Sequence, residues 1–268
     1  MEKNLRKVSV LVPTFRPGNY LVDCLQSIEN QTLDRKLFKV YIGLNGDFEP
    51  YYKFVENALV CAGFEYELFY IEKSGVSNAR NFLIEQSQEE YIVFVDDDDL
   101  LSPNYLEELL RVSSSDAMGI ANVYNFEETI GEKKTNYIGM AFQAIVDGES
   151  SKFKARKYFS SPWAKMLHRG MIAHHLFDPR VAKGEDSLFM AMLSPHVKCV
   201  RKTSDDACYF VRERIGSVTR RKTPLRSEIK TLSYLMLKYF RLLSCSCYDK
   251  SFIITRLIAT ALKFFKMT

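Results

Sequence analysis

The 268-residue chain lacks several patterns that would assign it to a familiar class. Its six cysteines include no CxxC pair, which argues against a zinc site and leaves reduced thiols as the expectation. No uninterrupted apolar run reaches the length of a membrane-spanning helix. The polar segment 1–7 leads directly into a predicted strand. We therefore expect no signal peptide there and a cytoplasmic location.

Charge is distributed unevenly along the chain. Residues 201–268 contain 15 Lys and Arg against 5 Asp and Glu, whereas residues 1–200 contain 22 against 28. Residues 226–266 interleave basic and apolar side chains at helical spacing, which predicts two helices with a broad apolar face and a basic fringe. Such helices can lie on the inner face of an anionic plasma membrane, pack on the preceding domain or form a homodimer, and these alternatives stay open. We expect no nucleic-acid partner, because no aromatic RNA-binding motif accompanies the basic residues.

Short apolar segments alternate with helical ones over roughly the first 115 residues. The predicted strands are 8–12, 38–44, 66–71 and 91–95, and the predicted helices between them are 20–31, 54–62 and 77–86. This alternation predicts an α/β fold, with a mostly parallel sheet flanked by helices. Further strands are predicted near 117–126 and 207–212, whereas 129–158 is expected to be an irregular cover over a cleft.

Four consecutive acids, Asp96 to Asp99, follow the strand at 91–95. Carboxylates in contact repel one another, and unpaired ones are costly at the end of a buried strand. Mg²⁺ and Mn²⁺ would resolve this conflict, because they bind hard oxygen ligands, usually one or two carboxylates together with substrate phosphates. The end of a parallel strand is also where α/β sheets bind ligands. The segment therefore predicts a metal–diphosphate site, and the alternative is a solvated acidic turn that caps a helix beginning near Pro103.

Three other polar segments would reach the same edge of the sheet. Residues 13–16 follow the first strand. Residues 75–81 open a helix, where the helix N-terminus and Arg80 can bind phosphate. Glu185 and Asp186 are expected at the start of another helix, where acids also simply stabilise the helix end.

In combination, these segments resemble the family-2 glycosyltransferases of the GT-A fold, from about residue 8 to about residue 219 and in the family's order. Residues 94–103 resemble the D-x-D-D metal motif, and residues 75–81 resemble the G-x-x-x-A-R-N segment. The remaining matches are VSVLVPTF at 8–15, SPWAKML at 161–167, FD at 177–178 with GED at 184–186, and YFVRER at 209–214.

The resemblance implies an inverting enzyme that moves one sugar from a nucleoside-diphosphate sugar to a saccharide or lipid-linked acceptor, in surface polysaccharide synthesis. It implies a nucleotide-sugar-binding and catalytic domain, which we place at 1–222, and the pattern of basic and apolar residues predicts a helical extension at 223–268. Mg²⁺ or Mn²⁺ would be held by Asp98 and Asp96, with Asp186 as the general base and Glu185 beside it. The residues expected at the nucleotide sugar are Pro13, Thr14, Phe15, Asn45, Asp47, Arg80, Asp96, Asp97, Arg212 and Arg214, and those expected at the acceptor are Trp163 and Lys165.

One segment departs from the family pattern. The family commonly shows an acidic D-D-G-S after the second strand, where this chain has Leu44-Asn45-Gly46-Asp47. Asn45 can still hydrogen-bond a base, and Asp47 can substitute, so the identity of the base stays open. The departure favours an alternative function, an inactive nucleotide-sugar-binding scaffold of the same fold. A sugar nucleotidyltransferase would need a glycine-rich loop that residues 13–18 do not provide, and a processive synthase would need the missing Q-x-x-R-W motif.

Overall fold

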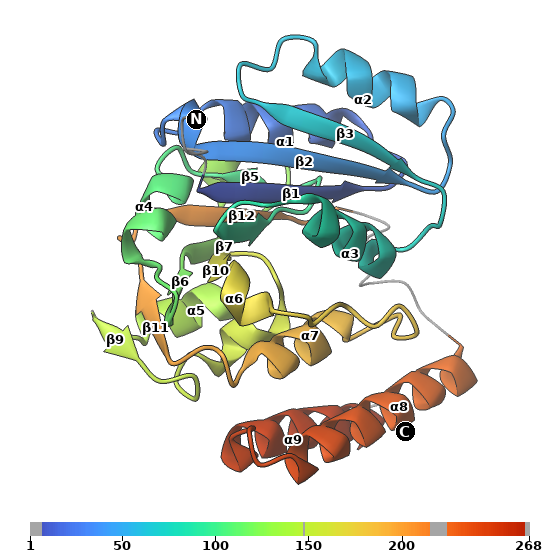
Figure 1. Ribbon diagram of the computed structural model, residues 1–268, viewed down its shortest axis with the longest axis vertical. Helices are drawn as coiled ribbons and strands as arrows, with labels where there is room; N and C mark the ends of the chain where they lie inside the picture. The colour runs from blue at the N-terminus through green and yellow to red at the C-terminus, as the bar shows by residue number, and fades with distance from the viewer. Residues whose placement is uncertain (1–6, 147, 215–223, 266–268) are drawn as a thin grey trace.

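The computed structural model describes residues 7–146, 148–214 and 224–265. Its centre is an eight-stranded sheet with the order β3-β2-β1-β4-β10-β6-β11-β9 (Figure 1). The first four of these strands are parallel to one another, as the sequence predicts. Strand β10 runs antiparallel to both β4 and β6, while β11 is parallel to β6. The bounds are β1 Val8–Thr14, β2 Phe38–Asn45, β3 Tyr66–Ile71, β4 Tyr91–Phe94, β6 Ala117–Ile120, β9 Glu149–Ser150, β10 Lys165–His168 and β11 Cys199–Lys202.

The parallel strands are connected through helices α1 (Asn19–Glu29), α2 (Tyr51–Leu59) and α3 (Val76–Gln86). Every residue of β1 and β4 is buried, which explains why both strands are mostly apolar. The two buried hydroxyls of β1, on Ser9 and Thr14, donate hydrogen bonds to Glu89 and Asp97. Helix α3 packs against β1 and β2, with Leu83 fully buried between them. The carboxyl ends of β1, β2 and β4 therefore lie at one edge, next to the start of α3.

A second sheet, with the order β5-β12-β7-β8, lies beside this edge. Its strands are β5 Leu100–Leu101, β7 Asn122–Phe126, β8 Lys134–Thr135 and β12 Cys208–Arg212. Because β5 follows the acidic segment directly and pairs with β12, the late strand brings Arg212 close to the acids.

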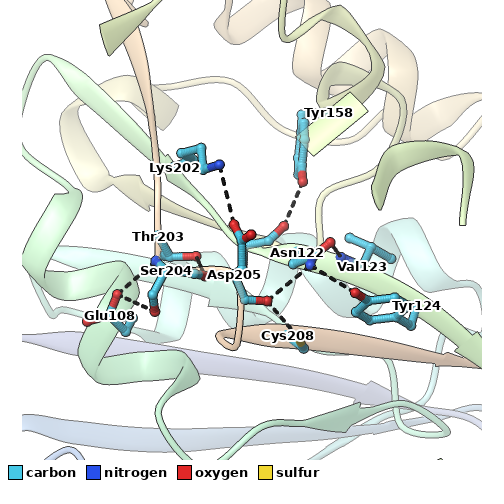
Figure 2. A network of polar contacts seen from close by, with 11 residues as sticks. Glu108, Asn122, Val123, Tyr124, Tyr158, Lys202, Thr203, Ser204, Asp205 and Cys208 are labelled. Atoms are coloured by element: carbon cyan, nitrogen blue, oxygen red, sulfur yellow. Dashed lines mark hydrogen bonds and ion pairs between the residues drawn. The ribbon is translucent and has the colours of Figure 1, made fainter. Parts of the chain in front are cut away.

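Polar contacts hold the turn that precedes β12 (Figure 2). Glu108, on helix α4 (Tyr105–Val112), accepts hydrogen bonds from both the backbone N–H and the hydroxyl of Ser204, at 2.9 and 2.8 Å. The Asn122 amide donates to the carbonyl of Asp205 at 3.0 Å, and Lys202 forms an ion pair with the Asp205 carboxylate. These contacts fix where β12 begins, and with it the position of the arginines at its end.

The prediction of an irregular cover at 129–158 is wrong. This stretch contains β8, β9, helix α5 (Tyr137–Gln143) and two short 3₁₀ helices, η2 (Ile130–Glu132) and η3 (Arg156–Ser160). Helix α5 packs on β7 and η3, and Ile138 and Phe142 are fully buried. Gly139 permits this contact, because a Cβ there would lie 2.1 Å from the carbonyl oxygen of Val123. In the sequence, a glycine at this position indicates a loop, although in the structure it serves close packing of a helix.

The described chain ends with two helices, α8 (Leu225–Ser244) and α9 (Lys250–Phe265), which lie side by side and run in opposite directions (Figure 1). They pack on one another, and each contacts α7 (Glu185–Leu193), which follows the short helix α6 (Arg169–Ile172). Leu235, Tyr239 and Ile253 belong to the same hydrophobic cluster as the sheet. The extension thus packs on the domain, and its predicted boundary at 222/223 lies outside the described residues. Within the described ranges, no helix combines the length and apolar content needed to cross a bilayer.

Candidate active site

Arg80 joins the two acidic segments that the sequence predicts at this edge. Its guanidinium donates to Asp186 Oδ1 at 2.6 Å and to Asp96 Oδ1 at 2.8 Å. The side chain is 4% exposed, and its charged end lies 5.3 Å from the centre of the Phe177 ring. Burial opposes its charge, but the two acids together raise the pKa of Arg80 above its ordinary value. Helix α3, the end of β4 and the start of α7 therefore meet at one buried cation.

Asn45 fastens the strand ends to the start of α3. Its amide donates to the Thr14 carbonyl at 2.8 Å, and its carbonyl oxygen accepts from the Gly75 N–H at 2.9 Å. Gly75 has a φ of 119°, which favours glycine there. Asn45 is 2% exposed, so the structure places it beneath the surface, where it joins backbone segments, and its predicted contact with a base stays a prediction.

The four acids after β4 divide into two kinds. Asp97 accepts a hydrogen bond from the hydroxyl of Thr14, and Asp99 accepts from the Arg212 N–H at 2.8 Å. Both are buried, and burial raises the pKa of Asp97 to about 7 and that of Asp99 well above its ordinary value. Asp96 and Asp98 keep 31% and 16% of their side chains exposed. Burial and the Asp96 charge also raise the pKa of Asp98. Asp96 and Asp98 are thus the pair available to a ligand.

Arg212 and Arg214, at the end of β12, place positive charge against this acidic segment, and their expected contact with a diphosphate stays a prediction. Arg212 donates to the Asp98 carbonyl at 2.9 Å and to the Asp23 carboxylate at 2.8 Å. Arg214 forms an ion pair with Asp98 Oδ2 at 2.5 Å and lies 4.4 Å from the centre of the Tyr20 ring. Two fixed cations therefore flank the partly exposed acids.

Glu185 and Asp186 occupy the first turn of α7. Gly184 precedes them with a φ of 93°, a left-handed conformation that lets the chain turn into the helix. Burial and the neighbouring Asp186 raise the pKa of Glu185 to about 7. Burial also raises the pKa of Asp186, and the charge of Arg80 opposes that rise. Both carboxyl groups of the pair therefore hold a proton more readily than ordinary acidic side chains.

The two residues expected at the acceptor differ in accessibility. Trp163 is partly exposed and stacks on Tyr209, with ring centres 5.1 Å apart and planes 8° apart. Lys165 is fully buried, and its ammonium donates to the carbonyls of Ser161 at 2.7 Å and Trp163 at 2.5 Å. Burial lowers the pKa of Lys165 well below its ordinary value. In this arrangement Lys165 holds the turn that carries Trp163, and a direct contact of either residue with an acceptor stays a prediction.

A cavity of about 600 Å³ opens at the carboxyl ends of β1, β2 and β3. Phe15 and Asp47, both expected at the nucleotide sugar, line it, whereas Pro13 and Thr14 are buried within β1. Asp47 pairs with Arg16 at 2.7 Å. The site residues expected from the sequence do not include the other lining residues, although Arg16 and Gly46 belong to segments already expected at this edge. The signal of the others is their position at or directly after the ends of β2 and β3. The complete set of other lining residues is Arg16, Gly46, Phe48, Glu49, Tyr70, Glu72 and Ser74.

A metal ion here would need ligands from outside the protein. In the described part of the chain, no three His, Cys, Asp or Glu side chains are grouped so as to hold a metal ion. Two partly exposed carboxylates, Asp96 and Asp98, do fit the usual Mg²⁺ arrangement, in which phosphate oxygens and water complete the coordination. The donor set is therefore compatible with Mg²⁺ or Mn²⁺ bound together with a diphosphate.

Comparison with known proteins identifies the family. Residues 9–172 match the model of glycosyl transferase family 2, so the chain belongs to that family. It is 28% identical to EpsH of Bacillus subtilis over 188 residues, which cover 64% of this chain and 50% of EpsH. It is also 28% identical to the glycosyltransferase GlyA of Streptococcus pneumoniae over 233 residues, 80% of this chain and 32% of GlyA. The chain thus spans half or less of the length of these relatives.

Solved structures identify the fold. The crystal structure of residues 1–349 of Staphylococcus aureus TarS, in complex with UDP-GlcNAc, superposes with a TM-score of 0.79 and 17% identity. The match covers 96% of this chain and 73% of that structure. The predicted GT-A fold, with its mostly parallel sheet and helical C-terminal region, is confirmed.

Proposed function

We propose that this protein is a glycosyltransferase that moves one sugar from a nucleoside-diphosphate sugar to a hydroxyl of a saccharide or lipid-linked acceptor. The observation that carries the proposal is the buried bridge in which Arg80 holds Asp186 at the start of α7 and Asp96 at the end of β4. It sets an acid suited to proton transfer beside acids suited to a metal–diphosphate group. Surface polysaccharide synthesis is the proposed setting. The structure of TarS in complex with UDP-GlcNAc supports the donor class. The name of TarS, a poly(ribitol-phosphate) β-N-acetylglucosaminyltransferase, supports the setting.

The nucleoside of the donor would occupy the cavity beside β1, β2 and β3. Its volume of about 600 Å³ lies within the range of small-molecule sites. Phe15, Phe48 and Tyr70 offer aromatic faces for stacking, and Asp47 offers a carboxylate to a base N–H. Arg212 and Arg214 are close enough to the acidic segment to bind the diphosphate.

Asp98 and Asp96 would hold Mg²⁺ or Mn²⁺, which would supply positive charge to offset the negative charge that develops on the departing diphosphate. Arg214 already contacts Asp98 at 2.5 Å, so the same carboxylate faces a cation in this structure. The buried Asp97 and Asp99 would hold the acidic segment in place, because they accept hydrogen bonds from the Thr14 hydroxyl and the Arg212 N–H.

Asp186 would accept the proton of the acceptor hydroxyl as that oxygen attacks the anomeric carbon. Its raised pKa makes it a stronger base than an ordinary aspartate, while Arg80 keeps the carboxylate oriented. A single base acting opposite the leaving diphosphate predicts inversion at the anomeric carbon. Glu185 would help to orient the acceptor, with Trp163 as a stacking surface for its sugar ring.

The partners beyond donor and acceptor depend on α8 and α9. The protein is proposed to act at the cytoplasmic side, with these helices contacting either the membrane or a second copy of the chain. Their inner faces already pack on the domain. Only their outer faces are therefore available to a partner.

An inactive nucleotide-sugar-binding scaffold is the second candidate. It is favoured by Leu44 and Asn45, one of which stands where the family commonly has an acid, and by the way Asn45 uses its amide group to join backbone segments. An inactive scaffold would bind nucleotide without turning it over, so release of nucleoside diphosphate separates the two functions.

The test is release of nucleoside diphosphate from a panel of nucleotide sugars with Mn²⁺, compared between the wild type, Asp186→Asn and the control Asp116→Asn. Asp116 is an acid with a 55% exposed side chain that lies immediately before β6 and pairs with Lys198. We expect turnover by the wild type and the control, and a loss of about 100-fold or more in Asp186→Asn, as for removal of a general base. Nucleotide binding without turnover in the wild type would favour the scaffold.

A further inference from the structure

Helices α8 and α9 expose large apolar side chains in addition to those that they bury against the domain. The side chains that fasten these helices to the domain are buried, including Leu232, Leu235 and Ile253. Seven others, 43–56% exposed, face away from that contact. They are Leu225, Ile229, Leu237 and Phe240 on α8, and Ile254, Ile258 and Leu262 on α9.

The exposed charges on the same two helices have one sign. The exposed residues of α8 include the bases Arg226, Lys230 and Arg241 and contain neither Asp nor Glu. The exposed residues in the described part of α9 include Lys250 and Lys263, again without an acid. We call these five basic residues, together with the seven apolar ones, the outer face.

We propose that the outer face docks on a bilayer rich in anionic phospholipid. Apolar side chains at helical spacing can enter the boundary between headgroups and acyl chains, while the bases beside them contact phosphate. Charge complementarity selects this partner, because the five exposed charges within the two helices are basic. The acids nearby are fewer: Glu228 of α8 is partly exposed, and the exposed Asp249 lies in the turn before α9.

A second copy of the chain fits the outer face less well. A two-fold interface sets the same patch against itself, so the bases of one protomer would approach those of the other. The exposed residues of these helices supply no acid to pair with them. An interface of this kind would bring like charges together while burying the apolar residues, which is costly.

Docking would also hold at the bilayer a helix that packs against the candidate active site, an extension that rests on the proposed function. Leu235, on the inner side of α8, lies 3.0 Å from where a Cβ on Gly184 would be, immediately before the acidic pair. Tyr234 donates to Asp178 at 2.7 Å on the segment that leads to the same turn. The helix that contacts the lipid therefore also supports the start of α7, where an acceptor attached to lipid would be needed.

The experiment is co-sedimentation of the full chain with vesicles of phosphatidylcholine alone, or of equal parts phosphatidylcholine and phosphatidylglycerol. We expect binding to the anionic vesicles, weak binding to neutral ones, and a decrease on raising the salt from 0.1 to 0.5 M. The triple variant R226Q/K230Q/R241Q should bind anionic vesicles about 100-fold more weakly. Leu237→Ser with Phe240→Ser should also lose binding, because the apolar contact is removed.

Matched controls carry the same changes elsewhere. Lys36, Lys53 and Lys198 are exposed, so their replacement by Gln removes equal charge from other surfaces. Val22 and Val60 are 42% and 75% exposed, and their replacement by Ser removes exposed apolar area from other faces. Circular dichroism melts confirm that each variant is folded.

Equal binding to both vesicle types, or equal losses in outer-face and control variants, would overturn the proposal. So would a wild-type dimer, seen by light scattering without lipid, that the Leu237 and Phe240 changes convert to a monomer. Vesicle binding requires no turnover. A failure of the docking proposal is therefore distinguishable from a failure of the proposed glycosyltransferase activity.

Discussion

Replacing Arg80 by Met tests the buried bridge at the centre of the site. Methionine keeps much of the aliphatic length beside Phe177 but removes the cation between Asp96 and Asp186. Removing one partner from a buried ion pair leaves uncompensated charge, which costs about 3–5 kcal/mol. Arg80 is 4% exposed, whereas its partners keep 31% and 22% of their side chains exposed, so water can partly solvate the orphaned acids. We therefore expect a loss near the lower end, about 3 kcal/mol.

The assay is urea unfolding at pH 7, with Arg111→Met as the matched control. Arg111 also forms an ion pair, with Glu108 at 2.8 Å, but it is 60% exposed. Exposed pairs contribute about 0–1 kcal/mol, so the control should change little. A change in Arg80→Met no larger than that of the control would refute the account of the bridge.

The same variant should also alter the acid–base behaviour of the site. The charge of Arg80 lowers the pKa of Asp186, so its removal should raise that pKa further. The acidic limb of turnover against pH should therefore move to higher pH in Arg80→Met. If the acidic limb stayed at the same pH, the charge of Arg80 would not control the pKa of the proposed general base.

Three further predictions concern other parts of the molecule. Arginine, tyrosine and lysine partners hold the pKa of Asp178 well below its usual range, so its stabilising effect is complete above about pH 4 and is lost as the pH falls. Asp178→Asn should thus lower the free energy of unfolding by about 2 kcal/mol at pH 7, with a gap that narrows below pH 4 in urea titrations. Gly139→Ala should lower the free energy of unfolding by about 2 kcal/mol or more in the same assay, because its Cβ would lie 2.1 Å from the Val123 carbonyl oxygen. The control Gly131→Ala should be nearly neutral, because the nearest atom to its Cβ lies at 3.9 Å. The proposed base Asp186 acts in its ionised form, and burial raises its pKa. We therefore expect kcat/KM to fall as the pH is lowered, with a midpoint above about 4, the ordinary pKa of an aspartate. A flat profile between pH 4 and 8 would contradict that role.

The parallel half of the fold could be predicted because its signals are local. Strands β1 and β4 are buried along their whole length, so each requires a mostly apolar segment that is visible in the sequence. The antiparallel placement of β10 between β4 and β6 could not be predicted, because it depends on pairing between distant segments. The 129–158 stretch was misjudged because Gly139 serves close packing there.

The site divides in the same way. The position of the acidic segment follows from the end of β4, but four identical residues give no sign that Asp97 and Asp99 turn inward while Asp96 and Asp98 stay partly exposed. The bridge from Arg80 to Asp186 spans 106 positions and requires the folded chain. Lys165 illustrates the limit most clearly, since a buried ammonium that holds backbone carbonyls has the same sequence signature as one that would face a ligand.

The central claim is that the carboxyl edge of the sheet binds a nucleoside diphosphate together with a divalent cation held by Asp98. The most direct test is thermal unfolding with each of UDP, GDP, CDP, ADP and TDP, with and without Mn²⁺, on the wild type and Asp98→Ala. A ligand at 100 times its Kd stabilises the folded state by about 2.7 kcal/mol, which corresponds to several degrees in Tm. The account predicts a Mn²⁺-dependent rise for at least one nucleotide that is lost in Asp98→Ala. No rise with any nucleotide, or an equal rise in both proteins, would contradict it.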